Sequence, residues 1–345
     1  MKPKRLIPIF VTAACALGAV PAASAATDVQ QATSANWSGY VVGSSSGTQN
    51  FSNVSGSWTQ PTAKCGSSDA GSYSAFWIGL GGSGQSQTEA LEQDGTEVDC
   101  SANGTPSYFA WYELVPAAPV KVDLGIHPGD HISSKVSVSG HAVTMYLDNE
   151  TTGQSYTKTL EMPNTPDTTS AEWIAEAPST CTQGASSCTP LPLTDFGKVQ
   201  FFDATATSTD GHTGTISDPE WNAAAVSLSP EGGADGGFSS QFASTASDST
   251  AGATPSSLSS DGSSFTVAWA DEATSTPTSV GSGGGDGSGY PSGYGGGDPY
   301  GYSGGGDGYS GGGGSYGYGG GGYGYGDGGG GWEIVVPGVG VIAIG

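Results

Sequence analysis

Positive charge is scarce in this 345-residue chain. Only eight residues are Lys or Arg, against 32 Asp and Glu, and no arginine follows Arg5. Nucleic-acid binding is therefore not expected, because little is available to neutralise phosphates. The formal net charge of −24 suits an acidic medium, in which carboxylates with a pKa of about 4 become neutral. A halophilic or simply soluble surface is the alternative explanation.

Patterns typical of metal sites and of common hydrolases are also missing. There is no Cys-x-x-Cys pair, no His-Glu-x-x-His, and neither Asp-Thr-Gly nor Asp-Ser-Gly. Gly43 to Gly47 matches Gly-x-Ser-x-Gly, but a strand-turn-helix context is lacking, so a serine nucleophile is not expected. We expect no metal and no organic cofactor. The histidines are expected at surface positions: His127, His131, His141 and His212.

The amino terminus has the pattern of a secretory signal peptide over residues 1–25. Basic residues precede a largely apolar run from Leu6 to Val20, and Ala23-Ser24-Ala25 fits a small-residue cleavage site. A membrane anchor is the alternative, but the apolar run is short and polar sequence follows it. We expect a secreted, extracellular chain that starts near Ala26 and has no transmembrane segment.

Four cysteines remain after the leader, and an even number in an exported protein indicates disulfide bonds. Cys181 and Cys188 flank a short loop and are predicted to form a local disulfide. That assignment leaves Cys65 to pair with Cys100.

Short runs rich in Val, Ile, Thr and aromatic residues alternate with turn residues from about residue 35 to 272. No stretch shows a convincing helical repeat, so the pattern predicts an all-β sandwich or jelly roll with a hairpin turning at Gly140-His141. The clearest predicted strands are Tyr108 to Val115, Ile132 to Ser139, Ala142 to Leu147, Glu172 to Ala175, Val199 to Ala204 and Phe265 to Trp269.

A different composition begins after Thr274. Of the 60 glycines, 30 fall between Gly281 and Gly331, together with nine of the 15 tyrosines. Residues 275–331 are therefore predicted to be a disordered tail. Residues 332–345 are apolar but too short to span a bilayer.

Two segments of the predicted β domain combine aromatic and acidic residues. The first runs from Phe76 to Gly82 and is followed by Leu91-Glu92-Gln93-Asp94-Gly95. In the second, Ala171 to Glu176, strand alternation places Glu172, Ile174 and Glu176 on one face. Such a face suggests a groove, although a solvated strand face is the commoner explanation.

Taken with three further segments in the same order, these residues resemble the glutamic peptidase family, the eqolisins or peptidase family G1. The further segments are Asn36 to Tyr40, Ala110 to Glu113 and Asp218 to Trp221. The resemblance implies a β-sandwich of two large antiparallel sheets whose concave face binds peptide. By position, it assigns a catalytic dyad to Gln93 and Glu172. Because Glu92 separates Leu91 from Gln93, where fungal members place leucine next to glutamine, Gln85 and Gln87 are the alternatives.

The chemistry that the resemblance implies is acid hydrolysis of peptide bonds by direct water attack. A glutamate with a pKa near 4 can take a proton from water and return it to the leaving amine. The glutamine orients the water and stabilises the oxyanion. Trp37, Trp77 and Trp111 either bind substrate side chains or belong to the core, and Glu176 either tunes Glu172 or faces solvent.

The expected protein is therefore a monomeric endopeptidase acting on proteins or peptides. The rival interpretation is a non-catalytic, lectin-like module that binds carbohydrate or cell wall, since aromatic-lined sandwiches also bind sugars.

Overall fold

The computed structural model describes residues 29–44, 50–67, 71–83, 90–182, 187–229, 251–271, 333–334 and 342–343. Within these ranges the chain is all-β, as predicted. No helix in the described ranges is long and apolar enough to cross a membrane. The predicted signal peptide, the glycine-rich tail, most of residues 332–345, Gln85, Gln87 and much of the Gly43–Gly47 match lie outside the described residues.

Every strand predicted from the sequence is present, most of them longer than predicted. The strands are β1 (Gln30–Ser34), β2 (Trp37–Ser44), β3 (Phe51–Thr59), β4 (Ser72–Gly81), β5 (Leu91–Cys100), β6 (Pro106–Leu114), β7 (Val120–Val122), β8 (His131–Ser139), β9 (Ala142–Asn149), β10 (Gln154–Glu161), β11 (Ser170–Glu176), β12 (Ser179–Thr182), β13 (Ser187–Pro190), β14 (Lys198–Ser208), β15 (Thr213–Thr215), β16 (Trp221–Leu228), β17 (Gly252–Pro255), β18 (Phe265–Ala270), β19 (Glu333–Ile334) and β20 (Ile342–Ala343).

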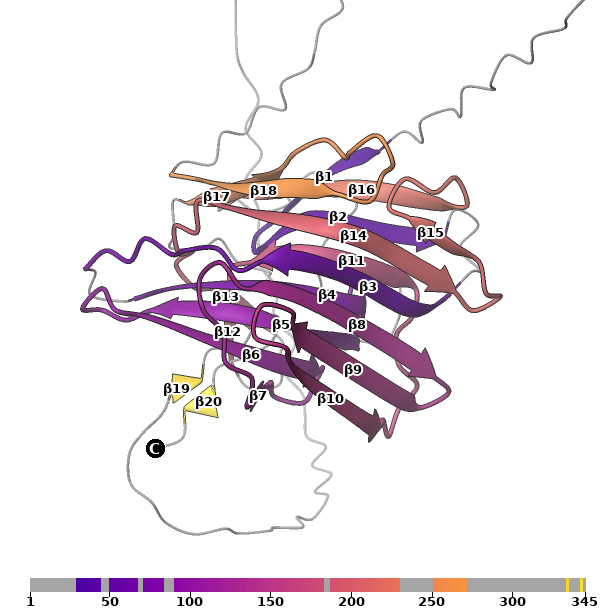
Figure 1. Ribbon diagram of the computed structural model, residues 1–345, viewed down its shortest axis with the longest axis horizontal. Helices are drawn as coiled ribbons and strands as arrows, with labels where there is room; N and C mark the ends of the chain where they lie inside the picture. Colours follow the sequence, from indigo (N-terminus) through magenta and orange to yellow (C-terminus); the bar gives the residue numbers. More distant parts are fainter. Residues whose placement is uncertain are drawn as a thin grey trace, which may run out of the picture. The chain divides into compact units, whose positions relative to one another are not determined.

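One continuous, mostly antiparallel sheet forms the body of the domain. Its strand order is β10-β9-β8-β3-β14-β18-β17-β16-β2-β11-β4-β5-β6-β7. The sheet folds back on itself, so its two halves form the two layers of a sandwich that overlap in Figure 1. The exception to antiparallel pairing is β1, which runs parallel to β16. The predicted two-sheet sandwich is thus confirmed, with both layers hydrogen-bonded through the same sheet.

The β8–β9 hairpin shows how the sequence produces these strands. In β9, buried and partly exposed residues alternate along the whole strand, as a strand with one face in the core requires. The turn falls at the predicted Gly140-His141, where Gly140 has φ of +63°. That conformation costs glycine little because it has no Cβ, so the turn position suits this residue.

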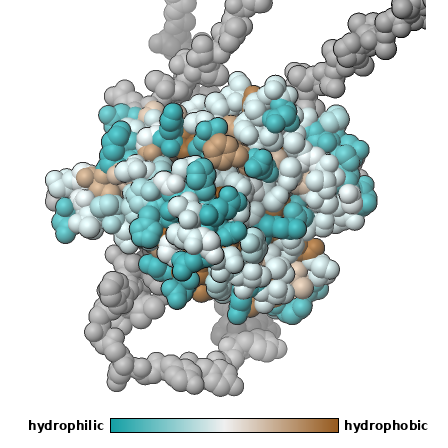
Figure 2. Space-filling view, viewed as in Figure 1, coloured by the Kyte–Doolittle hydropathy of each residue, from teal (hydrophilic) through white to brown (hydrophobic). Residues whose placement is uncertain are grey.

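Side-chain contacts fasten the two layers to each other. The indole Nε1 of Trp58 in β3 donates to Oγ1 of Thr96 in β5 at 2.9 Å. Nε1 of Trp173 in β11 donates to the carbonyl oxygen of Ser55 in β3 at 2.8 Å. Large apolar side chains fill the space between the layers, while the outer face seen in Figure 2 is mostly hydrophilic or neutral. The inner face of the sheet is therefore the core of the domain.

The Cys65–Cys100 disulfide is present, which confirms that prediction. It ties the segment before β4 to the last residue of β5, with 5.3 Å between the two Cα atoms. Cys181 and Cys188 are paired directly across the β12–β13 ladder. Their side chains lie outside the described part, so this second disulfide stays a prediction.

Candidate active site

The face of β2, β11, β4, β5 and β6 that points away from the core carries the predicted dyad. Residues on these strands are aligned in cross-strand rows by the ladder register. One row contains Glu172, Gly79, Gln93 and Glu113 in adjacent strands. Side chains in the same row point to the same side of the sheet. Gln93 and Glu172, 79 residues apart in sequence, are therefore brought to the same face, on either side of a glycine.

Gly79 leaves a gap between the two predicted catalytic side chains. It has no side chain, and a Cβ added there would approach Cβ of Gln93 and Cδ1 of Leu91 to 3.1 Å each. Adjacent strands lie about 4.8 Å apart, so the backbones of Glu172 and Gln93 are separated by roughly 10 Å. Two side chains at that distance can both reach a small group placed over the glycine.

Gln93 is held by Glu113 from the next strand. Nε2 of Gln93 donates to Oε2 of Glu113 at 2.8 Å, and both side chains are fully buried. Burial, followed by the nearby charge of Glu176, raises the pKa of Glu113 well above its usual range, and the Gln93 hydrogen bond opposes this shift. The bond fixes which end of the Gln93 amide faces Glu113, and therefore which end faces the gap.

The next row is aromatic and apolar. It places Ile174, Trp77, Gly95 and Trp111 side by side in β11, β4, β5 and β6. A Cβ on Gly95 would lie 2.6 Å from Cβ of Trp77, so only glycine fits between the two tryptophans. Trp37 from β2 contacts Trp77 edge-on, with 5.0 Å between ring centroids.

The three predicted substrate-binding tryptophans thus lie in one apolar cluster beside the dyad, separate from the core between the layers. All three are nevertheless buried. Their binding of substrate remains a prediction.

Glu176 belongs to a third row and does not face solvent, so that alternative is wrong. It is fully buried, with Oε1 accepting from Nδ2 of Asn36 at 2.8 Å and Oε2 from Nε1 of Trp77 at 2.7 Å. Its charge helps to raise the pKa of Glu97 and of Glu113. Glu176 therefore orients Trp77 and contributes to a group of acids across the sheet.

Glu172 differs from the expected glutamate of ordinary pKa. It is fully buried, and burial raises its pKa well above 4.5. The nearby Ser170 side chain opposes the shift, while the charges of Asp167 and Glu92 add to it. In the folded protein Glu172 is therefore protonated over a wider pH range than a free glutamate.

Comparison with known proteins places this arrangement in a family. A family model described as the Peptidase A4 family matches residues 35–229, more than half of the chain. The chain belongs to the Peptidase A4 family. The resemblance to the glutamic peptidases is confirmed at the level of the family.

Relatives and solved structures agree with this assignment to the Peptidase A4 family. Aspergillopepsin-2 from Aspergillus niger is 31% identical over an alignment of 196 residues that covers 51% of this chain and 65% of that protein. The chain therefore spans just under two-thirds of the length of that relative. The scytalido-glutamic peptidase, solved with a peptide-based transition-state analogue, has a TM-score of 0.52 and 26% identity over 68% of this chain and 98% of its own. SCP-B, an eqolisin solved with the tripeptide Ala-Ile-His, has a TM-score of 0.50 and 25% identity over the same shares.

Three acids of this Peptidase A4 face were missed as site residues by the sequence reasoning: Glu113, Glu97 and Asp99. Alternation along β5 from Gln93 would have placed Glu97 and Asp99 on its face, and Glu113 follows Trp111 by two residues. Burial is the first cause that raises the pKa of Glu97 and of Asp99, and Lys121 lowers that of Asp99.

No group of His, Cys, Asp and Glu in the described part is arranged to hold a metal ion.

Proposed function

We propose that the chain is a secreted acid endopeptidase that hydrolyses peptide bonds by direct attack of water, with Glu172 and Gln93 as its dyad. The observation that carries the proposal is the shared cross-strand row, in which Glu172 and Gln93 stand on either side of Gly79. A carbonyl group and a water molecule over that glycine would meet a carboxyl group on one side and a carboxamide on the other. Membership of the Peptidase A4 family supports the same assignment.

The reaction needs only these two side chains and water. Burial is the first cause of the raised pKa of Glu172, so opening of this face to water lowers that pKa again and lets the group ionise at acid pH. Ionised Glu172 then takes a proton from water as the water oxygen attacks the carbonyl carbon, and the carbonyl oxygen becomes an oxyanion. Gln93 accepts a hydrogen bond from the water through Oε1 and donates one to the oxyanion through Nε2. Protonated Glu172 then gives its proton to the amide nitrogen, the C–N bond breaks, and a carboxylic acid and an amine leave. Because neither side chain has exposed surface, this face must open to admit the substrate.

Glu113 acts as a positioning residue in this scheme. The two ends of a carboxamide are nearly equal in shape, yet the proposed roles of Gln93 need its donor and acceptor in defined places. The bond from Nε2 to Oε2 of Glu113 fixes which end of the amide is the donor and which is the acceptor. Glu113 thereby selects the amide orientation without touching the reacting atoms.

The tryptophan cluster supplies donors suited to a peptide backbone. Among the described residues, Nε1 of Trp37 and Nε1 of Trp111 are buried and have no hydrogen-bond partner. A buried unpaired donor is costly, typically about 1–3 kcal/mol, and a bound peptide carbonyl would relieve that cost. Both indoles share the apolar cluster next to the dyad. We therefore assign Trp37 and Trp111 to substrate binding and Trp77, which is bonded to Glu176, to support of the cluster.

The deciding experiment measures cleavage of an unfolded protein by the purified mature chain from acid to neutral pH, with an aspartic-protease inhibitor in parallel. The variants are Glu172→Gln and Gln93→Ala, and the matched control is Glu150→Gln at an exposed position. We expect inhibitor-insensitive cleavage confined to acid pH, reduced about a hundredfold or more by either dyad variant and unchanged in the control. No cleavage by a folded sample, or full activity of Glu172→Gln, would refute the proposal. In the first case a sugar-binding module becomes the better explanation.

Secretion has its own test. Edman sequencing of the protein recovered from the culture medium should show an amino terminus near Ala26. A cell-retained chain that keeps residues 1–25 would contradict this part of the proposal.

A further inference from the structure

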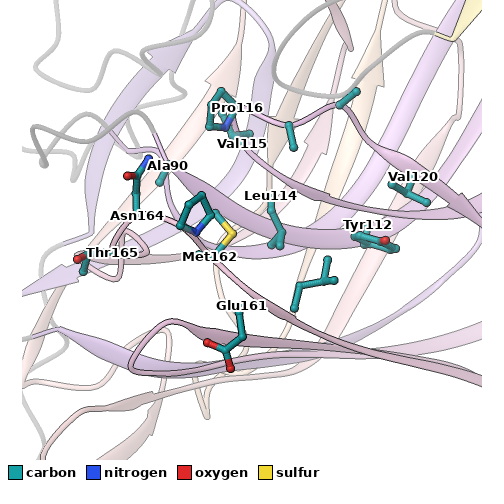
Figure 3. Close-up of a pocket in the computed structure, with 14 residues that line it drawn as sticks. Ala90, Tyr112, Leu114, Val115, Pro116, Val120, Glu161, Met162, Asn164 and Thr165 are labelled. Atoms are coloured by element: carbon teal, nitrogen blue, oxygen red, sulfur yellow. The ribbon is translucent and has the colours of Figure 1, made fainter. Parts of the chain in front are cut away.

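An open groove of about 840 Å³ has a lining that contains neither residue of the predicted dyad. It is bordered by the connection from β6 to β7, by the segment that follows β10, and by Ala90, which precedes β5 (Figure 3). In Figure 3 Leu114 and Met162 lie near its centre, Tyr112 and Val120 toward one end, and Asn164 and Thr165 toward the other. The volume falls in the range of sites that take up several side chains.

The lining of the groove is apolar although the chain is strongly acidic. Among the described residues of the lining, Glu161 alone is charged. Val120 lines this groove, and it is 43% exposed. Among the described residues, no other large hydrophobic side chain is classed as exposed. Apolar surface kept open to water in this way is typical of a binding site. The chemistry favours an uncharged, apolar occupant.

Two sheet edges border the groove. The strand order of the large sheet begins at β10 and ends at β7, and both strands contribute lining residues, Leu160 and Glu161 from β10 and Val120 from β7. In the described ranges, neither strand has a second neighbour in the sheet. An edge strand offers unpaired backbone donors and acceptors that an extended peptide can use.

The groove is continuous with the dyad face through Val115. This residue is buried in the cluster that contains the site tryptophans, and it also lines the groove. The backbone N–H of Val115 donates to the carbonyl oxygen of Leu91 at 3.0 Å. Leu91 lies in β5, two residues before Gln93. Leu114, which follows Glu113 directly, points to the opposite side of the sheet and forms part of the groove. A polypeptide that leaves the dyad face at this end can therefore pass around β6 after Tyr112, where its pairing with β7 ends, and enter the groove.

We propose that the groove is an exosite that holds an extended apolar segment of the polypeptide substrate while another segment of the same chain is cleaved at Gln93 and Glu172. This inference rests on the proposed function, because it takes the occupant to be the substrate. It predicts a preference for long, unfolded, apolar polypeptides over short peptides.

The test compares kcat/KM for a reduced, carboxymethylated protein with kcat/KM for a hexapeptide, both at acid pH. Val120→Arg and Ala118→Arg each place a charge in the groove at an exposed position; arginine is used because a new glutamate would be partly neutral at that pH. Thr157→Arg, exposed on β10 and outside the lining, is the matched control. We expect the protein-to-peptide ratio of kcat/KM to fall about tenfold in both groove variants, through KM, and to stay unchanged in the control.

Binding of the same unfolded protein to Glu172→Gln, measured by fluorescence anisotropy, gives a second result that does not depend on cleavage. Adding Val120→Arg to this variant should weaken binding about tenfold. An unchanged ratio of kcat/KM, or unchanged binding, would overturn the exosite. If wild-type protein cleaves neither substrate, the proposed function fails separately, and the anisotropy result still decides whether the groove holds polypeptide.

Discussion

The folded domain should lose stability as the pH rises from acid to neutral, and Glu92 allows the size of the effect to be worked out. Glu92 is fully buried on the core side of β5, between Leu80 and Leu114 in its row. Burial, with a smaller contribution from the charge of Asp167, raises its pKa from 4.5 to about 9. In the unfolded chain the same group titrates at its ordinary value, so at intermediate pH the folded state holds a proton that the unfolded state has lost.

The sign follows from this difference in bound protons. Stability is fully present below pH about 4.5 and falls by about 1.4 kcal/mol per pH unit above it, until the folded pKa is reached. Between pH 4.5 and pH 7, Glu92 alone should cost about 3 kcal/mol. Typical domains have only about 5–15 kcal/mol of stability, so two or three such acids could unfold this one near neutrality. Burial also raises the pKa of Asp94, Glu97 and Glu172 well above the usual range.

The assay is urea unfolding followed by tryptophan fluorescence at pH 4 and pH 7, for wild type, Glu92→Gln and the exposed control Glu150→Gln. The free energy of unfolding of Glu92→Gln minus that of wild type should increase by about 3 kcal/mol from pH 4 to pH 7, because the glutamine cannot ionise. The control should show no such difference. A wild-type stability that is level or rises between the two pH values, or a Glu92→Gln difference below about 1 kcal/mol, would refute the reasoning.

Three further outcomes can be measured directly. Glu113→Ala should lower kcat by about tenfold or more with little change in KM, because Gln93 loses the partner that orients it. Glu113→Gln keeps an acceptor and should retain most of the activity. Equal losses for the two variants in steady-state assays would contradict this role. Gly79→Ala should reduce kcat/KM more than thermal stability, since the new Cβ crowds Gln93 at 3.1 Å, and calorimetry beside kinetics checks it. Cys65→Ser with Cys100→Ser opens a loop of 35 residues and should cost about 4 kcal/mol in chemical unfolding at acid pH.

Much of the fold could be predicted because its signals are local. Alternation in β9 and the glycine turn at Gly140-His141 reflect rules that act over two or four residues, so the hairpin was placed correctly from sequence. The same alternation put Glu172 and Glu176 on one face. The assignment of Gln93 and Glu172 to one dyad comes from the resemblance to a family. Nothing in the spacing of the two residues shows that β4 lies between their strands.

Cross-strand register explains what was missed. Glu113 reaches Gln93 only because β5 and β6 pair with those two residues opposite each other, and a shift by one residue would turn Glu113 toward the core. Asp94 presents the reverse case. It is a charged residue type inside the sandwich, fully buried and bonded to the hydroxyl of Ser134 in the facing layer. Average burial preferences would place this aspartate at the surface, and only the packing of the two layers shows otherwise.

Salt distinguishes the two explanations of the acidic composition. If neutral pH destabilises the domain through repulsion among exposed carboxylates, sodium chloride should restore stability, because about 1 M salt screens charges beyond about 3 Å. If the cost comes from ionising buried acids such as Glu92 and Asp94, salt cannot reach them and should restore little. The burial of these acids predicts the second result. Unfolding at pH 7 in low and high sodium chloride tests it, and recovery of most of the acid-pH stability at high salt would favour a merely soluble or halophilic surface.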